Sequence, residues 1–229
     1  MIRPKPLARI AGALYLGMSV CFVLAGSLRS QVIGAHAEAM AERIRDSTMM
    51  FRVSLAVDLA SGALFLFTAA ALFLLLKEVN QLVAAAMVAL VALSVGVECA
   101  TLSNQYAALT IATHADYARA LGPSGSEALV RLFADLQGKG LVIDELFWGL
   151  WLLPLGYLVI KSGYFPKLVG VLLIVACFAW LAELFVTVLA PDLHRVNSVL
   201  TAGAIGELVF IVWLLVKGAK VPMPAGPIG

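Results

Sequence analysis

The chain is poor in charged residues and in cysteine, and each shortage limits what it can be. Only 13% of its 229 residues are charged, 62% are hydrophobic, and the mean hydropathy is +0.98. A soluble domain carries about 25% charged residues, so a water-soluble globular protein is excluded. A net charge of +2 is too small to predict a nucleic-acid partner. The three cysteines lie inside apolar runs, which excludes a disulfide framework and indicates small packing residues.

Long apolar runs are what the chain has in abundance. In a bilayer every backbone polar group needs a partner within the protein, which leaves helices and closed β-barrels. A barrel needs alternating strands of about ten residues, whereas these runs are continuous and about twenty residues long. The sequence therefore predicts an all-α fold, a polytopic integral membrane helical bundle that forms a single membrane domain. Its six transmembrane helices are expected at residues 7–28, 51–76, 82–112, 138–160, 166–189 and 196–216.

The predicted connections differ in length. Two long loops, 29–50 and 113–137, fall on the same side of a six-helix bundle, and each is expected to hold a short interfacial helix. Ser124 and Glu127 form a capping-box pattern, followed by Leu129, Leu132 and other apolar residues at helical spacing. Pro154 is expected to kink the fourth span.

Orientation rests on the basic residues at the start of the chain. The two sides of the predicted bundle carry equal numbers of Lys and Arg, so a count alone decides nothing. Arg3, Lys5 and Arg9 precede or begin the first span, and such a cluster usually stays inside. We therefore expect a plasma (inner) membrane protein with both termini in the cytoplasm and the two long loops outside.

Six of the fourteen acidic residues lie inside the predicted spans, whereas no Lys or Arg lies deep in any span. An ionised residue at a helix centre costs about 2.5–3.5 kcal/mol to insert. These acids must therefore face the bundle interior, meet a cation or carry a proton. Under the predicted topology five of them share the outer half of the bilayer, and the sixth lies near the middle of its span. The five are Asp58, Glu98, Asp144, Glu145 and Glu183, and the sixth is Glu207.

Helical spacing places these acids on polar and aromatic faces. Glu98 shares a face with Ser94, Thr101 and Gln105. Tryptophans follow the same pattern, since Trp148 and Trp151 lie one and two turns after Asp144, and Trp180 lies one turn before Glu183. The sequence thus predicts a pocket in the outer half of the membrane, lined by carboxylates and tryptophans. The alternative is structural, with each acid bonding a neighbouring helix. The nearest cations are expected to be Arg52, Lys139 and Arg195.

Several kinds of chemistry fit such a pocket. It could bind a lipid, a hydrophobic small molecule or a cation, with the bilayer as the surrounding partner. It could be a membrane enzyme of the isomerase or cyclase type, in which neighbouring carboxyl groups act as acid and base. It could be a small proton-coupled transporter that works as a homo-oligomer, or a structural or regulatory membrane partner.

Motifs that would narrow the choice are missing. There is no HExxH, no paired-His spacing, no GxSxG, no P-loop and no dinucleotide fingerprint, so no cofactor is indicated. No metal site is predicted either, and the nearest candidates for ligands are His114 and His194. Binding is the reading we favour from the sequence.

Three stretches resemble a family of uncharacterised bacterial multi-pass membrane proteins, catalogued as a domain of unknown function of about this length. They are the start, Arg9–Leu16, the entry to the second span, Arg52–Asp58, and a block from Gly156 to Gly170 that contains the Lys161–Phe165 turn. The resemblance implies a helical bundle in a bacterial inner membrane. It implies no activity and no catalytic residues.

Overall fold

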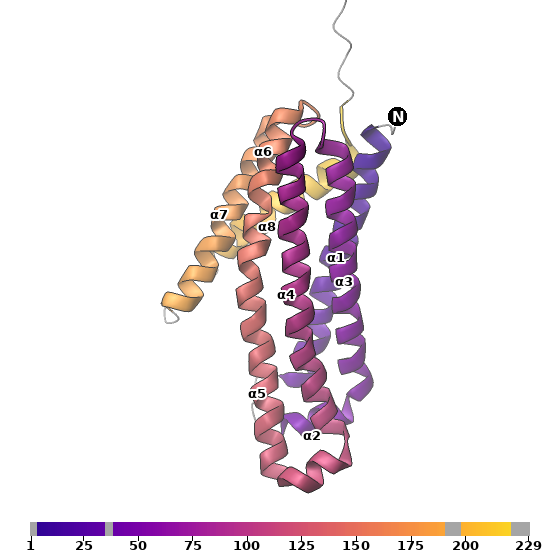
Figure 1. The fold of residues 1–229 in the computed structure, drawn as a ribbon, viewed down its shortest axis with the longest axis vertical. Helices are drawn as coiled ribbons and strands as arrows, with labels where there is room; N and C mark the ends of the chain where they lie inside the picture. Colours follow the sequence, from indigo (N-terminus) through magenta and orange to yellow (C-terminus); the bar gives the residue numbers. More distant parts are fainter. Residues whose placement is uncertain (1–3, 35–38, 191–197, 221–229) are drawn as a thin grey trace, which may run out of the picture. The chain divides into compact units, whose positions relative to one another are not determined.

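The computed structural model describes residues 4–34, 39–190 and 198–220, and all regular structure in these ranges is α-helical (Figure 1). The helices are α1 (Pro4–Ile33), α2 (Met40–Asp46), α3 (Thr48–Leu76), α4 (Gln81–Thr113), α5 (Ala115–Leu150), α6 (Leu152–Ser162), α7 (Lys167–Leu189) and α8 (Ser198–Val216). The predicted all-α class is therefore confirmed. Five segments are long and apolar enough to cross a membrane: α1, α3, α4, α5 together with α6, and α7. The described apolar part of α8, Ile205–Val216, is shorter.

The distribution of buried side chains in α3 shows why this fold suits lipid. Its buried positions recur alternately after three and four residues, so the pattern repeats every seven residues, as in a helix that packs in a bundle. They include Phe51, Ser54, Asp58, Ser61, Phe65, Thr68, Leu72 and Leu75. The opposite face exposes Leu59, Leu66, Phe67 and Leu74. The buried face thus combines polar and apolar side chains, whereas these exposed side chains are all apolar, an arrangement that suits lipid better than water.

The chain divides into two compact units, which are described separately. Unit 1 comprises Met1–Leu16, Phe65–Ser94 and Glu145–Gly229, and unit 2 comprises Gly17–Leu64 and Val95–Asp144. The helices α1, α3, α4 and α5 contribute residues to both units.

Glycines allow the helices of unit 1 to pack closely. A Cβ added at Gly156 of α6 would lie 2.8 Å from the carbonyl oxygen of Gly170 in α7, and one added at Gly206 of α8 would lie 2.7 Å from that of Leu172. Close crossings of this kind rely on small residues.

Three chain segments meet at one end of unit 1. The backbone N–H of Lys220, just after α8, donates to the carbonyl oxygen of Tyr164 in the α6–α7 turn at 3.0 Å. Gly218 lies against Lys5 at the start of α1. The start of α1, the α6–α7 turn and the end of α8 therefore share one end of the unit.

Unit 2 has an apolar core where α2 meets the longer helices. Its buried members include Ile44 of α2, Phe51 of α3, Ala108 of α4 and Val130 of α5. Glu127 of α5 holds α2 in place, because its Oε1 and Oε2 accept the backbone N–H groups of Met40 and Ala41 at 2.6 and 2.9 Å. These are orphan donors at a helix start, which a carboxylate satisfies well.

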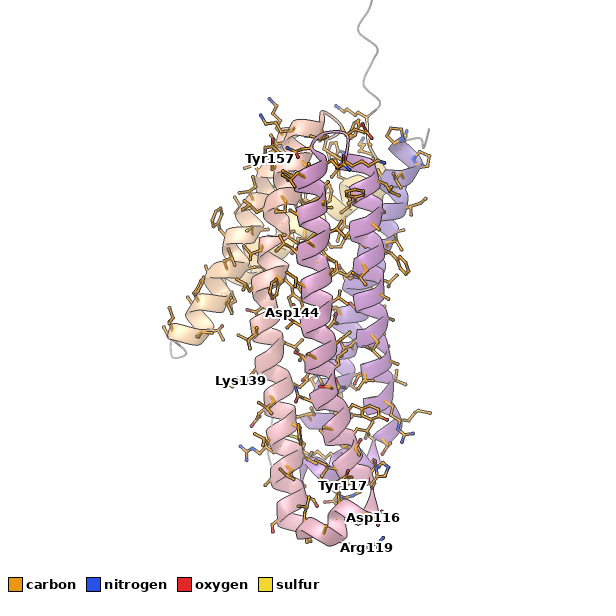
Figure 2. All side chains as sticks on the ribbon, viewed as in Figure 1. Asp116, Tyr117, Arg119, Lys139, Asp144 and Tyr157 are labelled. Atoms are coloured by element: carbon orange, nitrogen blue, oxygen red, sulfur yellow. The ribbon has the colours of Figure 1, made fainter. Side chains whose placement is uncertain are left out.

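The structure has helix over nearly all of the predicted connection 113–137, so the short helix expected within it is part of a longer one. The helix α4 ends at Thr113 and α5 begins at Ala115. The start of α5 carries the exposed ion pair of Asp116 and Arg119 (Figure 2). A single non-helical residue, Gly122 with φ 69°, interrupts α5 before Pro123. Proline suits the first turn of a new helical stretch because it needs no N–H partner.

The other long loop, 29–50, is also shorter than predicted. The helix α1 continues to Ile33, and α2 occupies Met40–Asp46 as the expected short helix. The sequence predicts that Glu127 forms a capping box with Ser124. In the structure its carboxylate instead accepts the backbone N–H groups of α2. In the fourth span the helix breaks at Trp151, three residues before Pro154. Proline has no N–H, so the carbonyl of Leu150 loses its helical partner.

Candidate functional site

A buried ion pair in unit 2 joins α1 to α3. The Nη1 atom of Arg29 lies 2.6 Å from Oδ2 of Asp58, and the two side chains are 13% and 5% exposed. Asp58 faces inward because it occupies the seven-residue seam of α3. Arg29 reaches it because α1 continues one turn beyond the predicted end of the first span.

Two further carboxyl groups lie in the same unit. Glu98 of α4 packs against Gly62 of α3, where an added Cβ would lie 2.8 Å from Oε2 of Glu98. Glu98 is 7% exposed and Asp144 of α5 is fully buried. Among the described groups, those that act electrostatically on Glu98 are Asp144, Asp58 and Arg29. This cluster of three carboxyl groups and one guanidinium, here called the acid seam, would carry excess negative charge if every acid were ionised.

Neutral polar side chains share the buried face of α4 with Glu98. The four residues that the sequence placed on one face, Ser94, Glu98, Thr101 and Gln105, are all buried. Nε2 of Gln105 donates to Oγ of Ser54 at 2.8 Å.

A pocket of about 450 Å³ opens at the end of α1 in unit 2. Its polar lining combines Arg29, Ser30, Asp135 and Gln137. Gln137 is 3% exposed, and its Nε2 has no hydrogen-bond partner. A buried donor without a partner costs about 1–3 kcal/mol, so a residue that lines this pocket carries an unsatisfied donor.

In unit 1 the acidic residue with the best-defined partners is Glu207 of α8. Tyr15 of α1 donates its hydroxyl to Oε2 of Glu207. Nε1 of Trp180 in α7 donates to Oε1 at 2.8 Å. Both carboxyl oxygens are therefore engaged, and the residue ties three helices together.

The remaining candidates of unit 1 are tryptophans and two acids. Trp151 is 1% exposed and lies edge-on to Tyr15 and Phe65, with ring centroids 5.5 and 5.0 Å away. Trp148 packs edge-on against Trp180. Glu183 is buried and Glu145 is half-buried. The sequence candidates thus fall into two sets. Asp58, Glu98, Gln105 and Asp144 lie in unit 2, whereas Glu145, Trp148, Trp151, Trp180, Glu183 and Glu207 lie in unit 1.

The described residues contain no group of three or more His, Cys, Asp or Glu side chains that could hold a metal ion. His114 is exposed, and its Nδ1 lies 2.9 Å from the carbonyl oxygen of Thr110. His194 and Arg195 lie outside the described residues.

Comparison with known families matches residues 10–218 to the domain of unknown function DUF4386. The chain belongs to the DUF4386 family. The match covers most of the chain and confirms the resemblance to a family of unknown function. An uncharacterized protein of Archaeoglobus fulgidus is 34% identical over 91 residues, which are 38% of this chain and 52% of that protein. The match thus spans about half the length of that relative. No solved structure matches the chain.

The acid seam and the pocket of this DUF4386 protein each contain a residue that the sequence did not single out, Arg29 and Gln137. Arg29 was expected outside the first span, so Arg52 and Lys139 seemed the nearer cations. Lys139 and Asp144 both belong to α5 (Figure 2), but five residues turn a helix by about 140°. Lys139 is accordingly exposed while Asp144 is buried. Gln137 had no signal in the sequence beyond being polar near a predicted span.

Proposed function

We propose that this DUF4386 protein is a membrane-embedded binding protein that takes the polar group of an amphipathic ligand into the pocket of unit 2. The observation that carries the proposal is Gln137, a residue that lines the same pocket as Arg29 and whose buried Nε2 lacks a partner in the described structure. Ligand pockets combine apolar walls with a few convergent polar groups. Here Ile33, Met40 and Ala134 supply the apolar part.

One residue of the acid seam, Asp58, fixes the position of Arg29, which also lines the pocket. Asp58 holds the guanidinium of Arg29 at 2.6 Å and so limits where it can point. An Arg has five N–H donors, and this pair uses one of them. The remaining donors are available to a ligand in the pocket that Arg29 lines.

Native mass spectrometry of protein released gently from membranes tests the proposal. We expect a stoichiometric amphipathic adduct on the wild type that is reduced by Gln137→Leu. Gln81→Leu is the matched control, because Gln81 is exposed at the start of α4 and does not line the pocket. Wild-type protein that never carries an adduct in lipid would contradict the proposal.

A second candidate function is proton coupling, and the acid seam favours it. Three carboxyl groups share the neighbourhood of one guanidinium in the described part of unit 2. Buried acids in such surroundings take up and release protons in transporters. Proton uptake by reconstituted vesicles that Glu98→Gln abolishes would favour transport. Ligand binding without proton uptake would exclude proton coupling and support binding as the only function.

For the topology, we propose six membrane crossings in a bacterial plasma membrane, with both termini in the cytoplasm. The contacts of Lys220 with Tyr164 and of Gly218 with Lys5 support an even number of crossings, since they return the end of α8 to the start of α1. Several lysines belong to this end of unit 1, which suits a cytoplasmic side.

A further inference from the structure

We propose that the pocket of unit 2 selects a zwitterionic phospholipid, whose phosphate lies against Arg29 and Gln137 and whose ammonium lies against Asp135. This inference rests on the proposed binding function and names its ligand class. The shared chemistry is an alkylammonium phosphate, the headgroup of phosphatidylethanolamine.

The inner part of the pocket offers hydrogen-bond donors. Arg29 provides a guanidinium that is 13% exposed and fixed by Asp58. Gln137 provides an amide nitrogen with no partner in the described structure. Ser30 also lines the pocket, but its hydroxyl donates to the carbonyl oxygen of Ser27 at 2.9 Å, so Arg29 and Gln137 are the donors offered to a ligand. A phosphate accepts from guanidinium and amide groups at once, and the charge-assisted bonds are the stronger ones.

The mouth of the pocket offers the opposite charge. Asp135 is exposed and also lines the pocket. An ionised carboxylate only accepts hydrogen bonds. Arg29 and Asp135 are the two charged residues in the described lining. A purely anionic ligand would be repelled by Asp135. A purely cationic ligand would leave the donors of Arg29 and Gln137 without an acceptor, whereas a zwitterion satisfies both sets of groups.

The position of the pocket indicates a lipid as the source of the headgroup. The helix α1 has 30 residues, which span about 45 Å at 1.5 Å per residue. A bilayer measures about 40–45 Å with its headgroup layers included. The last two turns of α1, which contain Arg29 and Ile33, therefore reach the headgroup layer. A volume of about 450 Å³ accommodates a headgroup, while acyl chains stay in the bilayer.

The test uses the full chain in detergent, with phosphatidylethanolamine, phosphatidylglycerol and soluble phosphoethanolamine as separate ligands. Native mass spectrometry measures the apparent Kd of each. We expect the wild type to prefer phosphatidylethanolamine over phosphatidylglycerol by about tenfold, the ratio that corresponds to about 1.4 kcal/mol. Asp135→Asn should remove this preference, whereas Asp116→Asn, an exposed acid outside the pocket, should keep it. Gln137→Glu should abolish binding of both lipids by placing a negative charge beside the phosphate.

The outcomes separate this inference from the proposed function. Equal affinity of the wild type for both lipids, with loss of both in Gln137→Glu, would overturn zwitterion selection and leave the binding function standing. Binding of both lipids that no pocket substitution changes would overturn both. Soluble phosphoethanolamine that competes as strongly as the lipid would overturn the assignment to a lipid. Asp135 is exposed, so Asp135→Asn keeps the test valid even if a Gln137 variant fails to fold.

Discussion

Glu207 shows how a single acidic residue can be stabilised within a span. Its carboxyl oxygens accept from Tyr15 and Trp180, so three helices depend on it. We expect Tyr15→Phe to lower the free energy of unfolding by about 0.6–1.7 kcal/mol, the range of hydrogen bonds between membrane helices. Unfolding in mixed detergent measures this. Tyr157→Phe is the control, because Tyr157 is 40% exposed on α6 (Figure 2). Equal loss in both variants would contradict a role for the bond.

The Arg29–Asp58 pair behaves differently, because removing one partner leaves the other charge buried. We expect Arg29→Ala to destabilise the protein by about 3–5 kcal/mol. The double variant Arg29→Ala, Asp58→Ala should recover part of that loss. Arg131→Ala, an exposed arginine of the same unit, should have little effect. The same unfolding measurement applies, and a double variant weaker than both single ones would rule out this account of the pair.

The sequence could predict which acids turn inward but not which cations they meet. Glu98 and Gln105 lie seven residues apart, and this periodicity alone placed them on the buried face. Arg29 can reach Asp58 only because α1 continues past the predicted end of the first span. The end of a helix is hard to predict from sequence within an apolar run. The unpartnered amide of Gln137 results from tertiary packing, so the spacing of residues in the sequence could not predict it.

At the scale of the elements, the short helix α2 depends on Glu127 from another helix. Glu127→Ala removes the acceptors of two backbone N–H groups. Losing a cap costs about 0.5–2 kcal/mol. We expect hydrogen exchange at Met40 and Ala41 to accelerate about 2- to 30-fold, which is that cost converted at about 1.4 kcal/mol per tenfold. Glu78→Ala, in the exposed α3–α4 turn, is the control. Unchanged exchange in Glu127→Ala would show that α2 holds without the cap.

The close packing of α8 against α7 depends on Gly206, and this can be tested by substitution. A Cβ at Gly206 would meet the carbonyl oxygen of Leu172 at 2.7 Å, whereas one at Gly96 would meet nothing within 4 Å. Backbone cannot move aside as a side-chain end can. We expect Gly206→Ala to destabilise by about 1–3 kcal/mol, and Gly96→Ala to leave stability unchanged or raise it by up to about 1 kcal/mol. Thermal unfolding in detergent compares them, and equal melting temperatures would refute the close crossing.

Element type was more predictable than element length. Continuous apolar runs predicted helices correctly, because a membrane leaves the backbone few alternatives. The sequence predicts that 113–137 is a long connection holding a short helix, and this stretch contains Gly122 and Pro123. In the structure these two residues mark one break within a helix. Val130 is buried in the core of unit 2, and Phe133 is half-buried against it. Tertiary packing thus stabilises the helix expected after Ser124, and the structure extends it to α5 as a whole.

For the whole molecule, the open question is how the chain crosses the membrane. Five described segments meet the length and hydropathy expected of a span, and α8 contributes a shorter apolar stretch. Five crossings would put the two ends of the chain on opposite sides. The bond between Lys220 and Tyr164 and the contact between Gly218 and Lys5 place the start of α1 and the end of α8 at one end of unit 1. Six crossings therefore fit the contacts better than five.

Substituted-cysteine labelling in intact cells tests this directly. Replacing Cys21, Cys99 and Cys177 by Ala provides a background for single cysteines. We expect Asn80→Cys, Lys161→Cys and Lys220→Cys to resist an impermeant reagent, because these positions would face the cytoplasm. Asp46→Cys and Asp116→Cys should label, because they lie at the opposite ends of α3 and α4 from Asn80. Labelling of Lys220→Cys alone from the first group would establish that α8 does not complete a crossing. Labelling of the first group and protection of the second would invert the orientation, and the pocket of unit 2 would then face cytoplasmic lipid.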